Sequence, residues 1–201
     1  MLLGSITLSQ AQSKAPNILV IGDSLSAEYG LVRGSGWIAL LQDRLKKAQR
    51  PERLVNAGIS GDTTAGGRSR LPALLAQHKP AILIIELGAN DALRGMPLAS
   101  TKANLTAMVQ AGQKAGAKVL LIGMEVPPNY GARYTQDFRD VFKAVAAEQK
   151  TALLPFLLAG VADRPDALSL FQADRIHPNE SAQPILAANV WPALQKLLAK
   201  K

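Results

Sequence analysis

The sequence predicts a single α/β domain built on an open, mostly parallel sheet of five strands. Continuous apolar runs of strand length recur along the chain, and such runs are typical of strands that are buried on both faces. Segments with helical periodicity separate these runs, and this alternation favours a parallel sheet with right-handed crossovers. A chain of 201 residues without an internal linker, repeat or low-complexity tract fits one domain with a single core.

The expected strands follow the apolar runs in chain order, and the fifth run is the weakest. We expect strands at residues 17–21, 54–57, 81–87, 118–122 and 151–154. The intervening periodic segments predict helices at residues 37–49, 69–77, 101–115, 135–149 and 179–198. In the first of these helices, Ile38, Leu41 and Leu45 would share one face. The expected helix ends are marked by the helix-breaking residues Pro51, Pro80 and Gly116.

The composition excludes several function classes. The chain has no cysteine, which rules out disulfides, thiolate nucleophiles and Cys-ligated metals. Its net charge is +8, which we interpret as a solvated basic face, with attraction to anionic lipid surfaces or acidic substrates as the alternative. Scarce aromatic residues and the lack of a nucleic-acid-binding motif argue against a nucleic acid partner.

The N-terminal segment differs in composition from the rest of the chain. Residues 1–13 carry no charge, and a short apolar run is followed by small residues that resemble a signal-peptidase site. We expect a signal-peptide remnant here, although its basic start is missing, with a frayed tail as the alternative. The domain proper then covers residues 14–201, and no apolar run approaches the length that spans a bilayer.

Two segments carry residues suited to a serine nucleophile and its base. Residues 22–26 (Gly-Asp-Ser-Leu-Ser) follow the first strand, so Ser24 would stand at the sheet edge where ligands bind. Asp174 lies three residues before His177. If the segment makes one turn, the Asp174 carboxylate can accept the Nδ1–H of the imidazole, which fixes the tautomer and leaves Nε2 free to take the serine proton. Read alone, the Asp-Ser pair equally fits a helix N-cap. The other histidine, His78, lies at an expected helix end, where a cation is common.

Two further segments offer hydrogen-bond donors for an oxyanion. Gly58 follows the second strand and lets a backbone N–H approach a ligand, while Asn90 follows the third strand and carries side-chain N–H donors. Asp91 could hold its loop by accepting local N–H bonds. The structural alternatives are a Gly-rich loop capped by Asp62 or Thr63, and an Asx-turn after the third strand. Together, the four segments supply a nucleophile, a base, its orienting carboxylate and oxyanion donors, which is the set needed for acyl transfer.

Other chemistries lack their motifs. The chain has no Gly-x-Ser-x-Gly elbow, no His-Glu-x-x-His zinc motif and no Gly-x-Gly-x-x-Gly after the first strand. The glycines at residues 61–67 miss a P-loop because no lysine follows them. We therefore expect no metal site.

These segments resemble the blocks of the SGNH (GDSL-type) hydrolase family, and most of all its bacterial thioesterase I/protease I/lysophospholipase L1 (arylesterase) group. The resemblance runs from about residue 17 to residue 198. It rests on residues 22–26, on Asn-Ala-Gly-Ile-Ser-Gly-Asp-Thr at 56–63, on Gly-Ala-Asn-Asp at 88–91, on Pro-Pro-Asn-Tyr-Gly at 127–131 and on Asp-Arg-Ile-His-Pro-Asn at 174–179. Glu28, Ala89 and Arg175 depart from the small residues or glycines common in the family, which puts substrate preference in doubt rather than the reaction.

The resemblance implies a three-layer, flavodoxin-like α/β/α domain with helices on both faces of the sheet. It implies Ser24, Asp174 and His177 as catalytic residues, with the Ser24 N–H, Gly58 and Asn90 forming the oxyanion hole. It also implies hydrolysis of acyl esters, acyl thioesters, lysophospholipids and aryl esters, without a cofactor and often in the periplasm.

The expected partner is a small acyl ester or thioester substrate, bound by a monomer that contacts lipid surfaces transiently. The candidate substrate contacts are Asp23, Leu25, Met96, Tyr130 and Ile176. Met96 and Tyr130 equally fit ordinary packing positions. Two rival functions stay open at this point: a carbohydrate acetyl esterase with the same triad, and a non-catalytic module that cradles a phosphate in the loop at 58–67.

Overall fold

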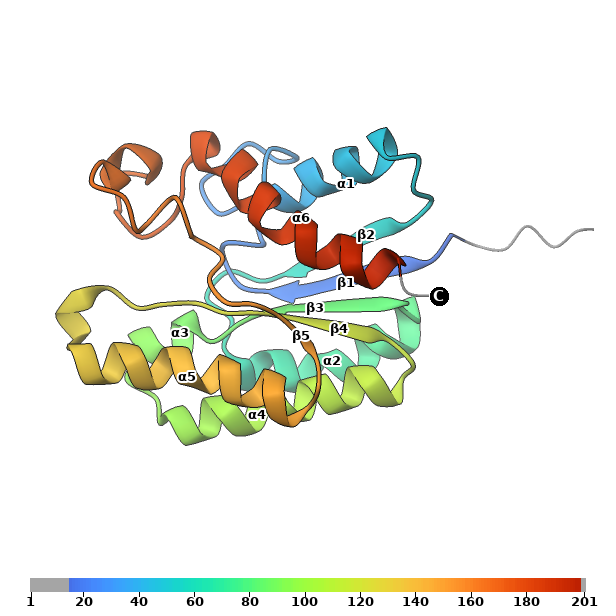
Figure 1. Ribbon diagram of the computed structural model, residues 1–201, viewed down its shortest axis with the longest axis horizontal. Helices are drawn as coiled ribbons and strands as arrows, with labels where there is room; N and C mark the ends of the chain where they lie inside the picture. The colour runs from blue at the N-terminus through green and yellow to red at the C-terminus, as the bar shows by residue number, and fades with distance from the viewer. Residues whose placement is uncertain (1–14, 200–201) are drawn as a thin grey trace, which may run out of the picture.

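The computed structural model describes residues 15–199 and contains a parallel sheet with the strand order β2-β1-β3-β4-β5 (Figure 1). The strands are β1 (Asn17–Gly22), β2 (Arg53–Gly58), β3 (Ile82–Glu86), β4 (Lys118–Ile122) and β5 (Ala152–Leu154). Each predicted strand is present, and every neighbouring pair is parallel. The predicted α/β fold with a five-stranded sheet is therefore confirmed.

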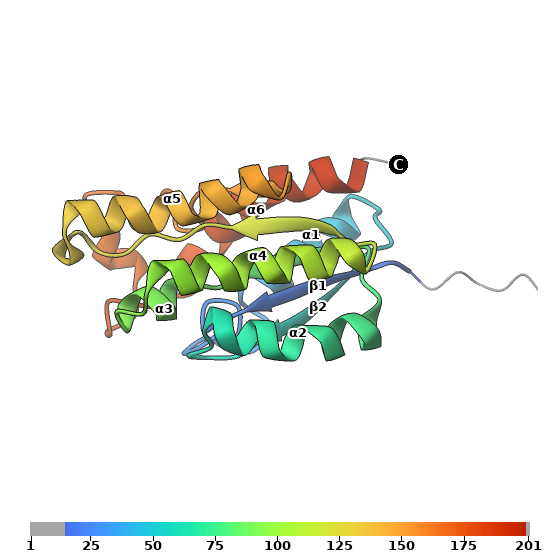
Figure 2. The same cartoon turned by 90° about the horizontal axis from the view of Figure 1, so that it is seen from below.

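Helices cover both faces of the sheet, as Figures 1 and 2 show. On one face α1 (Trp37–Lys47) packs against α6 (Gln183–Ala199). On the other face α4 (Leu98–Lys114) lies between α2 (Thr64–His78) and α5 (Ala132–Glu148). The connections contain the short helix α3 (Ala89–Leu93) and the 3₁₀ turns η1 (Pro128–Tyr130), η2 (Ala167–Leu170) and η3 (Glu180–Ala182).

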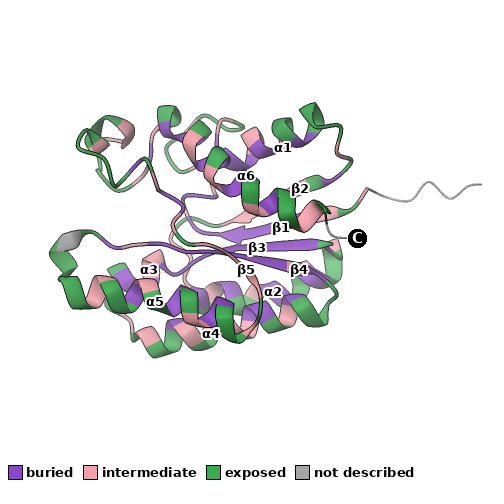
Figure 3. Cartoon of the chain, in the orientation of Figure 1, coloured by how far each residue is buried: buried purple, intermediate pink, exposed green. Residues whose placement is uncertain are grey.

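The central strands form the middle of the core, as Figure 3 shows. Every side chain of β3 is buried, and only the first residue of β1 and of β4 is partly exposed. The edge strands β2 and β5 are largely half-buried, because no further strand covers them. Helix α1 adds Trp37, Leu41 and Leu45, each fully buried, and burying one such side chain stabilises the fold by about 1.5–3 kcal/mol.

Helix α2 begins earlier than the sequence pattern predicts. Its first turn contains Gly66 and Gly67, which are poor helix formers and hide the periodicity. The Thr63 side chain caps this turn by accepting the N–H of Gly66. Gly67 packs so closely on the sheet that a Cβ would lie 2.3 Å from Cδ1 of Leu87. Tertiary packing therefore requires the glycine that local propensity disfavours.

Other helix starts also differ from the prediction. Helices α4 and α5 each begin three residues before the predicted start, and α3 forms where no helix was predicted. Helix α6 starts only at Gln183, because the 3₁₀ turn η3 precedes it. The Asn179 side chain caps η3 by accepting the N–H of Ser181.

The strand order places a topological switch point between β1 and β3. The chain leaves β1 towards β2 on one side, and leaves β3 towards β4 on the other. Ligands of open α/β sheets bind at the carboxyl ends of the strands at such a point. The segments that carry Ser24 and Asn90 follow these two strands, so the topology brings them to one location.

No helix in the range 15–199 has the length and apolar character needed to cross a membrane. The expected signal-peptide remnant at residues 1–13 lies outside the described residues.

Candidate active site

Three side chains from distant parts of the chain form a hydrogen-bonded row at the carboxyl edge of the sheet. Ser24 lies in the turn after β1, and its Oγ is 2.9 Å from Nε2 of His177. Nδ1 of His177 is 2.7 Å from Oδ2 of Asp174, and both residues lie in the loop before η3. The hydroxyl, the imidazole and the carboxylate thus stand in the order that a Ser-His-Asp triad requires.

The carboxylate of Asp174 is held by its own loop. Its Oδ1 accepts the backbone N–H groups of Ile176 at 2.9 Å and His177 at 3.0 Å. Burial by itself raises the pKa of Asp174, but these N–H groups and the His177 ring outweigh burial and lower the pKa to about 2. Arg175 has a φ of 59°, a region that favours glycine, which accounts for the glycine that is common in the family at this position; nothing in the structure explains the arginine. Asp174 is therefore ionised at neutral pH and can orient the imidazole.

The loop after β1 covers one side of this row. The ring of Tyr29 lies against the imidazole of His177, with 4.4 Å between the ring centroids. The carboxylate of Glu28 accepts the N–H groups of Gly34 and Gly36. Glu28 thus folds the loop, rather than placing a free charge at the mouth of the site.

The three expected oxyanion donors differ in the hydrogen bonds that they make in this structure. The backbone N–H of Ser24 has no hydrogen-bond partner among residues 15–199. One N–H of the Asn90 side chain donates to Oδ2 of Asp23 at 3.2 Å, which leaves its second N–H for another acceptor. Two of the three expected donors can therefore receive an oxyanion without losing a bond.

Gly58 is positioned by close backbone packing. A Cβ at this residue would lie 2.7 Å from the backbone nitrogen of Ala27, so only glycine fits. Its N–H donates to Oδ1 of Asn56 at 2.9 Å, and the Asn56 amide in turn donates to the carbonyl of Ser26. A bound oxyanion would have to replace the Asn56 oxygen as the acceptor of this N–H.

Comparisons with known proteins connect this geometry to one family. The model of the GDSL-like lipase/acylhydrolase family matches residues 20–183, which is most of the chain. The chain belongs to this family. The resemblance to SGNH (GDSL-type) hydrolases that the motifs carry is thereby confirmed.

Relatives of this acylhydrolase match nearly its whole length. Esterase TesA of Pseudomonas aeruginosa is 53% identical over 194 residues, which covers 96% of this chain and 95% of TesA. Thioesterase 1/protease 1/lysophospholipase L1 of Escherichia coli (strain K12) is 40% identical over 193 residues, 96% of this chain and 90% of the relative. A crystal structure of TesA has a TM-score of 0.86 and 55% identity, and the match covers 90% of this chain and 99% of that one.

Two of the expected substrate contacts are buried in this acylhydrolase. Leu25 is 8% exposed and packs into the core, while Asp23 is 1% exposed and accepts the N–H of Leu25 at 3.0 Å. Both belong to the tight turn that carries Ser24, which directs their side chains into the protein. In this structure these two side chains hold the turn, and their role as substrate contacts stays a prediction.

The other expected contacts lie on an apolar rim. Ile176 is 55% exposed, Tyr130 is 37% exposed and Met96 is half-buried. All large exposed hydrophobic residues of the described chain follow the carboxyl end of a strand: Tyr29, Val32, Ile59, Leu93, Tyr130, Leu168 and Ile176. Each therefore lies in a connection that leaves the carboxyl edge of the sheet, where ligands of open α/β sheets bind.

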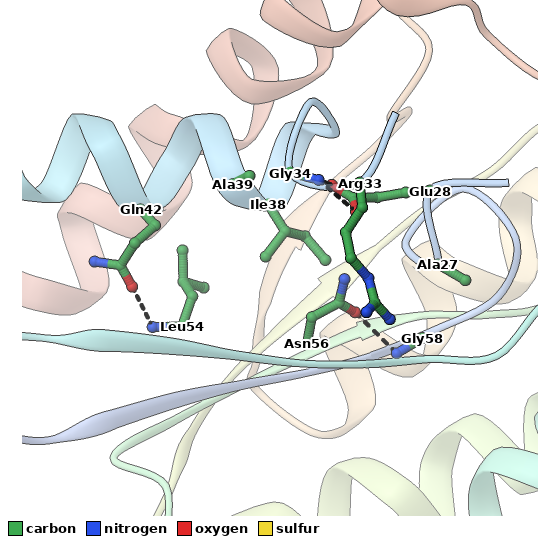
Figure 4. Close-up of a pocket in the computed structure, with 10 residues that line it drawn as sticks. All are labelled: Ala27, Glu28, Arg33, Gly34, Ile38, Ala39, Gln42, Leu54, Asn56 and Gly58. Carbon is green, nitrogen blue, oxygen red and sulfur yellow. Dashed lines mark hydrogen bonds between the residues drawn. The ribbon is translucent and has the colours of Figure 1, made fainter. Parts of the chain in front are cut away.

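A cavity of about 440 Å³ lies between α1 and β2, on the Gly58 side of the site (Figure 4). The side chain of Arg33 extends into it towards Asn56 and Gly58. Neither Ser24 nor His177 lines this cavity. It adjoins the site without containing the triad.

Asp91, which we expected to hold its own loop, instead joins two helices. It is 1% exposed and accepts the backbone N–H of Thr64 at 2.9 Å as well as the Thr64 hydroxyl. This contact ties α3, which carries Asn90, to the start of α2. Within residues 15–199, no group of three or more His, Cys, Asp or Glu side chains could hold a metal ion.

Sequence reasoning missed two polar residues beneath the nucleophile turn. Glu86, the last residue of β3, is fully buried and accepts the hydroxyl of Ser26 at 2.8 Å. The Arg70 guanidinium donates to the carbonyls of Gly22 and Ala57 at the ends of β1 and β2. A single acidic residue at the end of an otherwise apolar strand was the signal that could have revealed Glu86.

Proposed function

We propose that this chain is a serine esterase that hydrolyses carboxylic esters and thioesters, with Ser24 as nucleophile, His177 as general base and Asp174 as its orienting carboxylate. The observation that carries the proposal is the 2.9 Å contact between Nε2 of His177 and Oγ of Ser24. A nucleophile within hydrogen-bond reach of a base that a third group orients is the arrangement needed for acyl transfer.

The proposed reaction runs through an acyl-enzyme. Oγ of Ser24 attacks the acyl carbonyl as Nε2 of His177 takes its proton, and His177 then donates that proton to the departing alkoxide or thiolate. Water then attacks the acyl carbonyl as His177 takes one of its protons; the bond between the acyl carbon and Oγ of Ser24 breaks, His177 returns the proton to Oγ, and the carboxylic acid leaves. Asp174 remains ionised throughout and stabilises the imidazolium.

Covalent labelling tests the nucleophile directly. A fluorophosphonate probe is expected to label the native protein at Ser24 and to leave the Ser24→Ala variant unlabelled. Hydrolysis of p-nitrophenyl esters and acyl thioesters, measured on the same samples, tests the reaction. A native protein that is neither labelled nor active would instead support a non-catalytic binding module.

Asn90→Ala is expected to lower kcat by on the order of 10²–10³, because it removes one donor to the developing oxyanion. KM should change less than kcat, since the donor acts mainly on the transition state. Steady-state kinetics on a p-nitrophenyl ester measure both constants. Asn17→Ala, at the start of β1 and thus at the opposite edge of the sheet from Ser24, is the matched control. Near-normal kcat in Asn90→Ala would contradict the donor assignment.

The apolar rim supports acyl chains as the substrate class within this function. We propose acyl esters, acyl thioesters and lysophospholipids, in preference to acetylated sugars, because an aliphatic side chain such as that of Ile176 can bury an acyl chain but offers no hydrogen-bond partner to the hydroxyl groups of a sugar. Hydrolysis rates on acetylated sugars and on long-chain esters separate these two classes.

Replacing both Met96 and Tyr130 by alanine is expected to lower kcat/KM for long-chain esters by roughly 10-fold, because each side chain would bury apolar area against the chain. The rate on an acetyl ester serves as the internal control and should change little. A profile across acyl lengths that is the same in the variant and the native protein would exclude these two residues from the acyl site.

We also propose that the protein is exported to the periplasm or secreted, acts as a monomer and contacts lipid surfaces transiently through the apolar rim. The uncharged apolar composition of residues 1–13 supports export. N-terminal sequencing of the protein recovered outside the cytoplasm is expected to show that this segment has been removed; an intact Met1 there would contradict the cleavage.

A further inference from the structure

Glu86 lies directly beneath the turn that carries the nucleophile. Its Oε2 accepts the Ser26 hydroxyl at 2.8 Å and the backbone N–H of Asp23 at 3.3 Å. A Cβ at Gly22 would lie 2.7 Å from the same oxygen, so the turn folds closely over this carboxyl group. Glu86 therefore touches both sides of Ser24 in the sequence without touching Ser24 itself.

A second buried carboxyl group connects this anchor to the expected oxyanion hole. Asp23 accepts the backbone N–H of Leu25 through Oδ1 and the side-chain N–H of Asn90 through Oδ2. The chain of contacts runs from Glu86 to the Asp23 backbone, and from the Asp23 side chain to the Asn90 amide. A displacement of Glu86 would thus be transmitted to Asn90.

The hydrogen-bond donors assign different charges to the two acids. Asp23 receives two N–H donors that stabilise a carboxylate. Glu86 has no ion pair in the described chain, and its Oε1, although buried, has no hydrogen-bond partner there. A fully buried carboxylate beside a second one is costly, so Glu86 is the neutral member of the pair.

Burial and the neighbouring charges shift the pKa of both acids. Burial and then the charge of Asp23 raise the pKa of Glu86 well above its ordinary value. Burial raises the pKa of Asp23 to about 6, against the lowering effects of the Leu25 N–H, His177 and Asn90, while Asp62 raises it further. Arg70, the nearby cation, is paired with Asp62 at 2.8 Å and with backbone carbonyls.

We propose that Glu86 is a positioning residue for the reaction proposed above: as a neutral acid, it anchors the turn at residues 22–26 and, through Asp23, orients the Asn90 amide. The inference rests on the proposed function of Ser24 and Asn90. It adds a requirement that one buried proton remain on Glu86 while the enzyme works.

This requirement predicts the pH dependence. A raised pKa in the folded state means that the protonated form of Glu86 favours the fold and the active geometry. That contribution is present at low pH and is lost as the pH rises, because ionisation then places a second negative charge beside Asp23. The decline belongs to the alkaline side of the rate profile.

Three single variants test the proposal. Glu86→Leu keeps the volume but removes the acceptor, and kcat is expected to fall by up to about 10²-fold, with a smaller change in KM, because the donors are displaced. Glu86→Gln stays neutral at every pH, so it should recover most of the kcat lost in Glu86→Leu and remove the alkaline decline. Glu52→Gln changes another buried carboxyl, paired with Arg50 at the start of β2, and should match the native protein.

The measurements are kcat and KM for a p-nitrophenyl ester across pH, with fluorophosphonate labelling of each variant. A native protein without esterase activity would overturn the proposed function itself. If the native protein is active, a native-like kcat in Glu86→Leu would overturn the role of Glu86. Should Glu86→Leu not fold, Glu86→Gln decides: retention of the native alkaline decline would overturn the proposal.

Discussion

Replacing Ser24 or His177 by alanine is expected to lower kcat for ester hydrolysis by on the order of 10⁶, and the double variant should be no slower than either single one. The reason is the 2.9 Å contact between Oγ of Ser24 and Nε2 of His177, which makes the two groups one proton-transfer unit. Without the hydroxyl the base has no proton to take, and without the imidazole the hydroxyl is a weak nucleophile.

Steady-state kinetics of the two single variants and the double variant measure this effect. Ser69→Ala and His78→Ala are matched controls, because Ser69 is exposed within α2 and His78 ends α2, at the edge of the sheet opposite Ser24. Both controls should keep native rates. If the losses of Ser24 and His177 multiplied in the double variant, the two residues would not act as one unit.

Asp174→Asn is expected to lower kcat by about 10⁴-fold with little change in fold, as a carboxylate-to-amide change does in other Ser-His-Asp triads. Asp174 accepts two backbone N–H groups and the imidazole Nδ1, and these bonds lower its pKa to about 2, so it is ionised at working pH. An amide cannot stabilise the imidazolium, and its N–H₂ group favours the wrong imidazole tautomer.

The same ester assay measures this loss, and circular dichroism checks the fold. Asp43→Asn, on the exposed surface of α1 and paired with Lys46, is the matched control and should leave kcat unchanged. A kcat within 10-fold of the native value in Asp174→Asn would show that another group orients His177.

The layers of the fold could be predicted from the sequence, and so could the three residues of the proposed triad, which the structure brings within hydrogen-bond distance. Continuous apolar runs were sufficient to predict the positions of the strands, because a buried parallel strand must be apolar on both faces. Ser24 and His177 could be named because each stands in a short segment of chemically suited neighbours. The predicted α2 was too short, because Gly66 and Gly67 are poor helix formers. The structure shows why glycine is required there: a Cβ at Gly67 would collide with Leu87, and one at Gly66 with the side chain of Asp62.

Only the tertiary structure decided which side chains point towards the proposed reaction site and which hold its loops in position. Asp23 and Leu25 flank the nucleophile in sequence, yet the turn directs both inward, and Glu86, 60 residues from Ser26, lies beneath them. Local sequence patterns indicate whether a segment forms a helix or a strand, and which chemical groups it carries. They do not report the strand order that sets β3 beside β1, and this order determines that a buried acid from one strand anchors the turn of another.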